Sequence, residues 1–444
     1  MPPRTNPTYP YEFGGPKGCF LIMLYSHFLP YFFWLSLEIS QGGLPLPSSL
    51  SSSALSDYFL TIKTAFLEKA LPDLPSALFY LGFLLFQVLC SLFLPGVWIK
   101  GLPVPTENNK QHDYLCNGAA SWYVTLILVY VLERYEIMSL SFMAVNFGKL
   151  LTTSIIFSDI LSLIIYMAAE IQGKSIRMSG NFFYDFFMGA YLNPRIGYFD
   201  FKMWAEIRVS WILLFLLTLS AAVSQYQLSG TLSYSMIIIL TAHFLYTNAC
   251  MKGEECIPTT WDIFYEKWGW MLVYWNLAGV PFVYCFQAFY ILKNDPQLPF
   301  WWFLVLISTL LFAYYIWDTS QSQKNRFRMQ MKGTFVKRYT FPQLPWGTLK
   351  EPKFMRTENG DPLLLDGWWQ FARKIHYTCD ITMASIWGLS CGFGGILPYY
   401  YPIFFTIMIK HRSNRDFERC SRKYKKDWET YCEKVPYVWI PGVI

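Results

Sequence analysis

LLLDGWWQFARKIHYTCD, residues 363–380, joins two adjacent tryptophans to a basic, aromatic segment and leads directly into an apolar run. Tryptophan and tyrosine concentrate where a bilayer meets water, and lysine and arginine flank membrane spans on the cytosolic side. We therefore expect this stretch to lie at a membrane surface, with a chamber of membrane helices before it and a basic tail after it. Its rings and hydrogen-bond donors would also suit a nucleotide cofactor.

The composition places the whole chain in the same environment. Of its 444 residues, 54% are hydrophobic, 20% aromatic and only 15% charged, which is too apolar for a soluble domain of this length. The chain is therefore expected to be an all-α polytopic membrane protein. Its ten cysteines include no CxxC pair and it has only five histidines, so we expect no metal site and no disulfide framework.

Apolar runs near the length of a bilayer core predict the helices. A short polar arm at residues 1–17 precedes a transmembrane bundle at residues 18–318, with a loop at residues 40–53. The runs are apolar on all sides, as lipid-embedded helices are. The expected spans are residues 19–37, 77–99, 122–132 with extensions at either end, 150–169, 209–223, 232–246, 270–292 and 300–317.

The basic residues predict which segments face the cytosol. Of 36 lysine and arginine residues, 11 lie within residues 319–378 and 9 within residues 410–444, so the positive-inside rule predicts a cytosolic loop at 319–380 and a cytosolic helix and tail at 410–444. The apolar stretch 381–409 must then cross an even number of times. As one helix it would reach about 44 Å, too long for one span and too short for two. We expect a helical hairpin that turns at Gly392, Gly394, Gly395 and Pro398.

Three segments carry the cations and donors that a phosphate-rich cofactor needs. Lys324 and Arg328 are four residues apart and share a helix face if their segment continues the preceding span. The quoted stretch contributes Trp369, Arg373, His376 and Tyr377. The tail repeats a stripe at every fourth position, namely Arg412, Asp416, Cys420 and Tyr424.

Each group has a plainer alternative. Basic residues beside a span are ordinary topology signals, Trp368 and Trp369 could form an interfacial aromatic belt, and the tail could be a solvated surface helix. Ionisable groups at membrane depth are costly and indicate function, whereas an interfacial loop carries charge at little cost. Both alternatives, a functional group at membrane depth and an ordinary interfacial loop, are open for a polar set in or just after an apolar run. Its members are Tyr246, Asn248, Glu254, Glu255, Asp262, Glu266 and Lys267.

Four long motifs, in the same order along the chain, carry a family resemblance. They are YLCNGAASWY at 114–123, GAYLNPRIGYFDFKMWAEIR at 189–208, the quoted stretch at 363–380, and HRSNRDFERCSRKYKKDWETYCEKVPY at 411–437. From residue 114 to its end the chain resembles the sterol reductase family. The resemblance implies about ten membrane helices in the endoplasmic reticulum membrane, a cytosolic carboxy-terminal tail, and NADPH held at the cytosolic side by the carboxy-terminal half.

The family pattern also implies a cofactor site. The positions that match it are Lys324, Arg328, Leu364, Trp369, His376, Tyr377, Arg412, Asp416, Cys420, Tyr424 and Tyr431. Two positions depart from the pattern: His376 replaces the usual Asn, and Lys425 replaces a common Gly. We expect Lys425 either to contact a phosphate or to extend the tail helix.

One segment favours a particular double bond. Residues 252–285 resemble the C-24(28) reductases, whereas the C-14 and C-7 enzymes typically have Asp at Glu266 and Gly-Asp-Leu at residues 275–277. The expected activity is NADPH-dependent reduction of a 24-methylene sterol, the last step of ergosterol biosynthesis, with Tyr246 as the acid and Asp416 as its polar partner. A C-14 or C-7 reductase is the alternative within the family, and a non-catalytic sterol-binding membrane protein is the alternative outside it. Expected partners are the sterol, membrane lipid and other sterol-pathway enzymes, with no nucleic acid.

Overall fold

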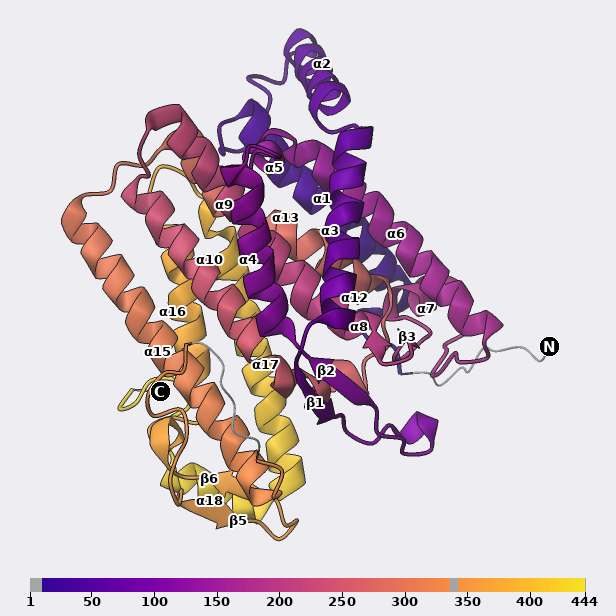
Figure 1. Ribbon diagram of the computed structural model, residues 1–444, viewed down its shortest axis with the longest axis vertical. Helices are drawn as coiled ribbons and strands as arrows, with labels where there is room; N and C mark the ends of the chain where they lie inside the picture. The colour runs from indigo at the N-terminus through magenta and orange to yellow at the C-terminus, as the bar shows by residue number, and fades with distance from the viewer. Residues whose placement is uncertain (1–9, 336–341, 444) are drawn as a thin grey trace. The chain divides into compact units, whose positions relative to one another are not determined.

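The computed structural model describes residues 10–335 and 342–443, and helices dominate it (Figure 1). Within these residues seven helices are long and apolar enough to cross a membrane, as a polytopic membrane protein requires. The chain divides into two compact units, Met1–Leu232 with Tyr246–Asp295, and Ser233–Leu245 with Pro296–Ile444. Each unit is described by itself. The first nine residues of the predicted polar arm lie outside the described residues.

The first unit contains most of the predicted spans. Its long helices match five of the expected runs and extend most of them by a few residues at each end. They are α1 (Gly15–Ile39), α3 (Leu74–Phe93), α4 (Gly118–Arg134), α6 (Phe147–Ile171) and α9 (Ser210–Ser229). Its other helices are α2 (Ser52–Lys69), α5 (Phe142–Val145), α7 (Phe182–Met188), α8 (Phe201–Met203), α11 (Trp261–Phe264), α12 (Trp270–Tyr274), α13 (Val280–Tyr284) and α14 (Phe286–Asn294).

The span expected at residues 77–99 ends too late. Asp73 begins α3, because its carboxylate accepts a hydrogen bond from the Ser76 amide. Pro95 and Gly96 follow the helix, and neither residue continues a helix well. The residues after them form β1 (Val97–Lys100), which pairs antiparallel with β2 (Asp113–Cys116). A second short pair joins β3 (Arg195–Ile196) to β4 (Phe199–Asp200).

The span expected at residues 209–223 begins too late. A π-helical turn, η2 (Trp204–Val209), joins α8 to α9 and makes one apolar helix of Phe201–Ser229. Its first turns hold charged residues, which hid the helix from a search for apolar runs. Lys202 is fully buried, and its ammonium donates to the carbonyl oxygens of Ile263 at 2.9 Å and Glu266 at 2.7 Å. A second π-helical turn, η4 (Trp275–Gly279), similarly joins α12 to α13.

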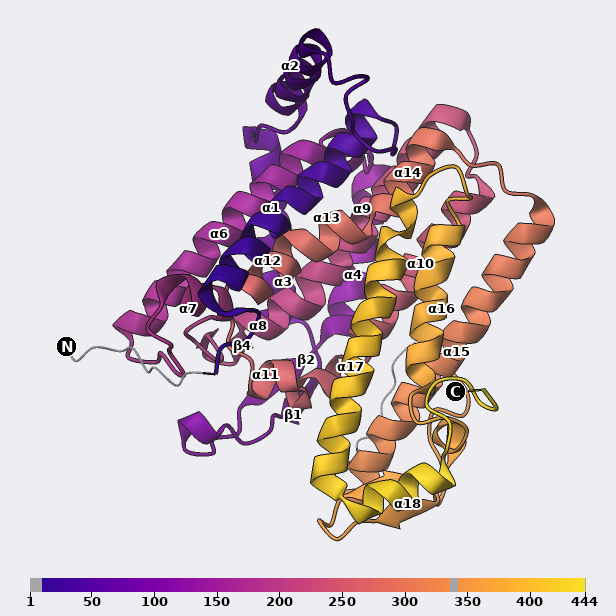
Figure 2. The same cartoon turned by 180° about the vertical axis from the view of Figure 1, so that it is seen from behind.

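The second unit is built on three long helices, α15 (Phe300–Met331), α16 (Ile375–Leu389) and α17 (Tyr400–Tyr424). Figure 2 shows them side by side, and α16 packs against both of the others. The chain reverses direction where the hairpin was expected: α16 ends at Leu389, α17 begins at Tyr400, and residues 390–399 connect them. They approach closely at Gly388, where a Cβ would lie 2.9 Å from Tyr399 Cδ1. The ring of the adjacent Trp387 stacks on that of Tyr401, with 4.7 Å between the ring centres.

Three predicted boundaries in this unit are wrong. The helix expected to end at residue 317 continues as α15 to Met331, so the loop expected from residue 319 begins after it. The tail helix expected from residue 410 is the second half of α17. Lys425 does not extend it, because its φ of 49° ends α17, and a separate helix, α18 (Lys426–Lys434), follows. Glycine adopts a positive φ more readily than other residues do, which accounts for the glycine that is common at this position in the family pattern.

Helix α10 (Tyr234–Lys252) contributes residues to both units. Near one end of α15, the second unit also holds a β-hairpin of β5 (Phe354–Arg356) and β6 (Pro362–Leu364), with α18 beside it (Figure 1). This end of the second unit carries the predicted cofactor residues.

Candidate functional site

The polar end of α15 supports the paired tryptophans. The Trp369 indole donates to the Ser320 carbonyl oxygen at 2.9 Å, and its ring packs in a buried cluster with Phe327, Leu349 and Leu364. The ammonium nitrogen of Lys324 lies 4.0 Å from the centre of the same ring, a distance at which a cation is attracted to the ring face. Lys324 and Trp369, both predicted to contact the cofactor, therefore contact each other.

The DGWW turn is shaped by a glycine. Gly367 has a φ of 61°, and a Cβ there would clash with the side-chain oxygen of Gln323. That oxygen accepts a hydrogen bond from the Trp368 amide at 2.9 Å, and the Trp368 indole donates to Thr319 Oγ1 at 2.8 Å. Both tryptophans are thus bonded to α15. These bonds within the unit hold both rings against the polar end of α15.

The first turn of α16 brings further rings and charges to this place. The His376 ring lies 5.0 Å from the Trp369 ring and 4.2 Å from the Tyr377 ring. The positive charges of Lys324, Lys374 and Arg412 all act on this imidazole. His376 is buried, and its Nδ1 atom has no hydrogen-bond partner in the described part of the chain. A buried polar atom without a partner is rare and points to a missing ligand or water.

An ion pair joins α16 to α17. The ammonium of Lys374 donates to Asp416 Oδ2, and the Lys374 side chain is only 11% exposed. Burial acts to raise the pKa of Asp416, but the charge and hydrogen bond of Lys374 outweigh burial and hold that pKa below its usual value. Asp416 is therefore a carboxylate at neutral pH. Lys374 was not among the predicted cofactor residues, and only the packing of α16 on α17 reveals its partner.

The tail closes over the other side of the quoted stretch. Cys420, Tyr424 and Tyr431 pack in a cluster with the buried Trp428 and Val435. Burial raises the pKa of Tyr431 well above that of a free phenol. Two further bonds hold the tail: the Arg373 amide donates to the Tyr437 carbonyl at 2.9 Å, and the Lys374 amide donates to the Val438 carbonyl at 2.7 Å.

The second unit thus gathers the predicted cofactor residues with different exposures. Lys324 contacts Trp369, Trp369 contacts His376, and His376 contacts Tyr377. Arg328 and Arg412 are exposed. Leu364 lies in the buried cluster beneath Trp369. Cationic side chains, ring faces and an unpartnered buried imidazole nitrogen are the groups that would suit a phosphate-bearing nucleotide.

The predicted acid lies in the first unit. Tyr246 is half-buried on α10, and its ring centre is 4.7 Å from that of Trp211. The neighbouring Asn248 accepts a hydrogen bond from the Tyr123 hydroxyl at 2.9 Å. Tyr246 therefore lies beside the Trp211 ring and two residues before the hydrogen-bonded Asn248.

The acidic and basic residues that follow α10 make structural contacts. Glu254 forms a buried ion pair with Arg208, with 2.6 Å between Oε1 and Nη2. Glu266 accepts a hydrogen bond from the Trp261 indole at 2.6 Å. The Lys267 ammonium donates to the Arg177 carbonyl at 2.9 Å, and burial lowers the pKa of Lys267 to about 8. Glu254 and Lys267 are buried, and these contacts join this part of the chain to other segments of the first unit.

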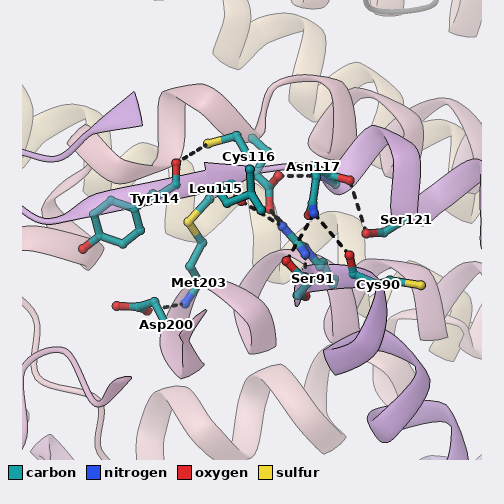
Figure 3. Close-up of polar contacts among 12 residues, drawn as sticks. Cys90, Ser91, Tyr114, Leu115, Cys116, Asn117, Ser121, Asp200 and Met203 are labelled. Carbon is teal, nitrogen blue, oxygen red and sulfur yellow. Dashed lines mark hydrogen bonds and ion pairs between the residues drawn. The ribbon is translucent and has the colours of Figure 1, made fainter. Parts of the chain in front are cut away.

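The first motif, at residues 114–123, also serves the fold. Figure 3 shows the Asn117 amide pointing to the end of α3. Its nitrogen lies within hydrogen-bond distance of three carbonyl oxygens, those of Cys90 at 3.1 Å, Ser91 at 3.2 Å and Leu94 at 2.7 Å. The Cys90 carbonyl also accepts from the Leu94 amide at 3.1 Å, whereas Pro95 has no N–H to donate to the Ser91 carbonyl. Asn117 therefore caps the end of α3, and it is also the N-cap residue of α4.

Comparisons with known proteins agree along nearly the whole chain. The model of the ergosterol biosynthesis ERG4/ERG24 family matches residues 7–444, so the similarity begins well before residue 114. The Delta(24(24(1)))-sterol reductase erg4A of Aspergillus fumigatus is 42% identical over 435 residues, covering 97% of this chain and 92% of that protein. The Delta(24(24(1)))-sterol reductase of Gibberella zeae is 41% identical, covering 100% and 74%. The Delta(14)-sterol reductase of Dictyostelium discoideum is 35% identical, covering 98% and 92%.

Proposed function

The chain belongs to the ergosterol biosynthesis ERG4/ERG24 family of sterol reductases, and on this premise we propose that it reduces the C-24(28) double bond of a 24-methylene sterol with NADPH, the last step of ergosterol biosynthesis. The observation that supports this choice most directly is the similarity to two fungal Delta(24(24(1)))-sterol reductases at 41% and 42% identity. Residues 252–285 favour the same bond.

We propose that the second unit holds NADPH. Lys324, Arg328 and Arg412 would neutralise phosphate oxygens, because the described residues form only two-stranded sheets and several cations are needed where a nucleotide-binding sheet is lacking. Trp369 and Tyr377 offer ring faces, and the unpartnered Nδ1 of His376 can bond to a polar group of the cofactor. When bound, NADPH supplies a hydride equivalent.

The proposed chemistry begins with a proton. An unactivated alkene does not accept hydride, so one carbon must be protonated first or at the same time. Proton donation from the Tyr246 hydroxyl to C-28 leaves a tertiary cation at C-24, where hydride then adds. A phenol has an ordinary pKa near 10 and is a weak acid, so it needs a dry site and a nearby group that stabilises the cation. The Trp211 ring beside Tyr246 can stabilise positive charge through its face.

We assign to Asp416 the polar role on the cofactor side. Its ion pair with Lys374 keeps the carboxylate ionised and fixes its orientation. A lysine and a carboxylate that neutralise one another leave the net positive charge of Lys324, Arg328 and Arg412 free to act on phosphate. In this proposal Lys324, Arg328 and Arg412 bind the cofactor phosphates, and the Lys374–Asp416 pair positions the Asp416 carboxylate.

The proposed topology has ten spans in the endoplasmic reticulum membrane. Adding α4, α16 and α17 to the seven candidate spans makes ten. The basic loop and tail would face the cytosol by the positive-inside rule. Accessibility labelling of single cysteines placed at residue 360 and in the tail tests this, and labelling of the two from opposite sides would contradict it.

The decisive experiment is turnover by the purified protein. We expect a 24-methylene sterol and NADPH to give the saturated side chain, with hydride label at C-24. Tyr246→Phe should lower kcat by at least about 100-fold, since general acid catalysis contributes that much or more. Tyr123→Phe is the matched control, because it removes a tyrosine hydroxyl that donates to Asn248, and it should retain most of the activity.

A Delta(14)-sterol reductase is the second candidate, because relatives with that name are also similar over nearly the whole chain. Competition between a 24-methylene sterol and a Δ14 sterol for the same enzyme separates the two. Preference for the Δ14 sterol would replace the first proposal. Isotope label from the NADPH hydride at C-28 instead of C-24 would show that hydride adds to C-28 and the proton to C-24, the reverse of the proposed positions.

A further inference from the structure

A histidine and an aspartate meet in the middle of two long apolar helices of the first unit. His27 is the 13th of 25 residues in α1, and Asp159 is the 13th of 25 in α6. Their Nε2 and Oδ2 atoms are 3.1 Å apart. At about 1.5 Å per residue both lie about 18 Å from either helix end, close to the middle of a bilayer core about 30 Å thick. Ionisable residues at this depth are functional candidates.

The pair is neutral as a whole. His27 Nδ1 lies 2.8 Å from the Met23 carbonyl oxygen, which can only accept a hydrogen bond. Nδ1 therefore carries a proton, and a second proton lies between Nε2 and Asp159. Whether that proton rests on the imidazole or on the carboxyl group, the charges sum to zero, which lowers the cost of burial in a membrane.

Trp270 joins His27 and Asp159 in a group of three polar side chains, the polar pole. The Trp270 indole donates to the other carboxylate oxygen of Asp159 at 2.7 Å, and the Trp270 ring stacks on His27 at 5.3 Å. The pair is not sealed by these contacts, because the His27 and Asp159 side chains remain 37% and 39% exposed. A carboxylate can accept about four hydrogen bonds, so Asp159 has acceptor capacity for a ligand.

The pole lies in a cavity of about 390 Å³ with otherwise apolar walls. The remaining lining residues are Met23, Ile160, Leu163, Phe182 and Phe186. The Phe182 and Phe186 rings stack at 5.6 Å and are nearly parallel, which makes part of the wall flat. An apolar cavity with a few convergent polar groups is the usual form of a small-molecule site. Neither Tyr246 nor any cofactor candidate lines it.

We propose that this cavity binds a sterol by its hydroxyl group, at a site separate from the one that carries out reduction. The hydroxyl would donate to Asp159, and the rigid ring body would lie along the apolar wall. A hydroxyl in the middle of a bilayer has no water to bond, so the polar pole is the partner that would hold it there. Hydroxyl recognition rests on the geometry, and the choice of a sterol rests on the proposed function.

The test is photolabelling of the full-length protein in lipid vesicles, using a photoreactive sterol with a free hydroxyl and no NADPH. Adducts mapped by mass spectrometry should fall on α1, α6 and α7. Asp159→Asn, which keeps an acceptor for Trp270, should reduce these adducts by about tenfold, the effect of losing one hydrogen bond to a charged group. His27→Phe, which keeps a ring against Trp270, should also reduce them, because it removes the partner that orients the Asp159 carboxyl group. Tyr31→Phe is the control: it removes a bond of 2.9 Å between the same two helices, to Thr152, but does not line the cavity.

Competition separates the sources of the hydroxyl. Unlabelled sterol should abolish the adducts, whereas its acetate ester and a long-chain alcohol should not. A lack of adducts on α1, α6 and α7, or adducts there that survive both variants, would overturn the inference, and competition by the long-chain alcohol would overturn the choice of a sterol. Because labelling needs no turnover, an inactive protein that still labels would count against the proposed reduction only. An active enzyme that fails to label would count against this site only.

Discussion

Gly367→Ala should destabilise the second unit more than any ordinary surface change. The left-handed backbone at this position costs an alanine about 1–2 kcal/mol, and the added Cβ would clash with the Gln323 side-chain oxygen. Moving that oxygen breaks its bond to the Trp368 amide, at a further cost of about 1 kcal/mol. The expected loss in the free energy of unfolding is about 2–3 kcal/mol. NADPH binding should also weaken, because Trp369 directly follows Trp368.

Gly360→Ala is the matched control for this prediction. Gly360 has a φ of 81°, so it carries the same backbone cost, but a Cβ there would meet no atom within 4 Å. The thermal unfolding midpoints of both purified variants should fall, with Gly367→Ala lower, and NADPH affinity should fall only in Gly367→Ala. Equal midpoints and equal affinities would refute the reasoning, because they would show that the contact with Gln323 is not what requires glycine at residue 367.

Three further predictions concern single side chains. Asp416→Asn should remove about 1 kcal/mol of stability at pH 7, a modest amount since the carboxylate is 35% exposed; because the folded pKa of Asp416 lies below its unfolded value, this difference should be present above about pH 4 and disappear as the pH falls through the folded pKa, which melting at successive pH values would show. Lys425→Gly should keep or raise the melting midpoint, since it relieves a positive φ, and an unchanged KM for NADPH would exclude a phosphate contact. Asn117→Ala should cost about 1–3 kcal/mol in thermal or denaturant unfolding by leaving the end of α3 uncapped; a loss no greater than that of an exposed asparagine would contradict the cap.

The helices could be predicted because their cause is local. A run of apolar residues about 20 long crosses a bilayer whatever the rest of the chain does, and glycine and proline mark where such a run turns. The hairpin of α16 and α17 followed from length and flanking charge alone. The short strands were missed, since two to four residues carry too little periodicity to be recognised. The early start of the helix Phe201–Ser229 was missed because Lys202 and Arg208 resemble a loop until their buried partners are known.

The sequence by itself determined that this chain spans a membrane as helices, where most of them lie, which segments are basic, and to which family it belongs. The tertiary structure decided which side chains meet: Lys324 with Trp369, Lys374 with Asp416, and His27 with Asp159, which are 132 residues apart. The physical reason is that a span is favoured by the composition of its own residues, whereas a pair of side chains depends on how two helices from distant parts of the chain pack, and no local pattern encodes that packing.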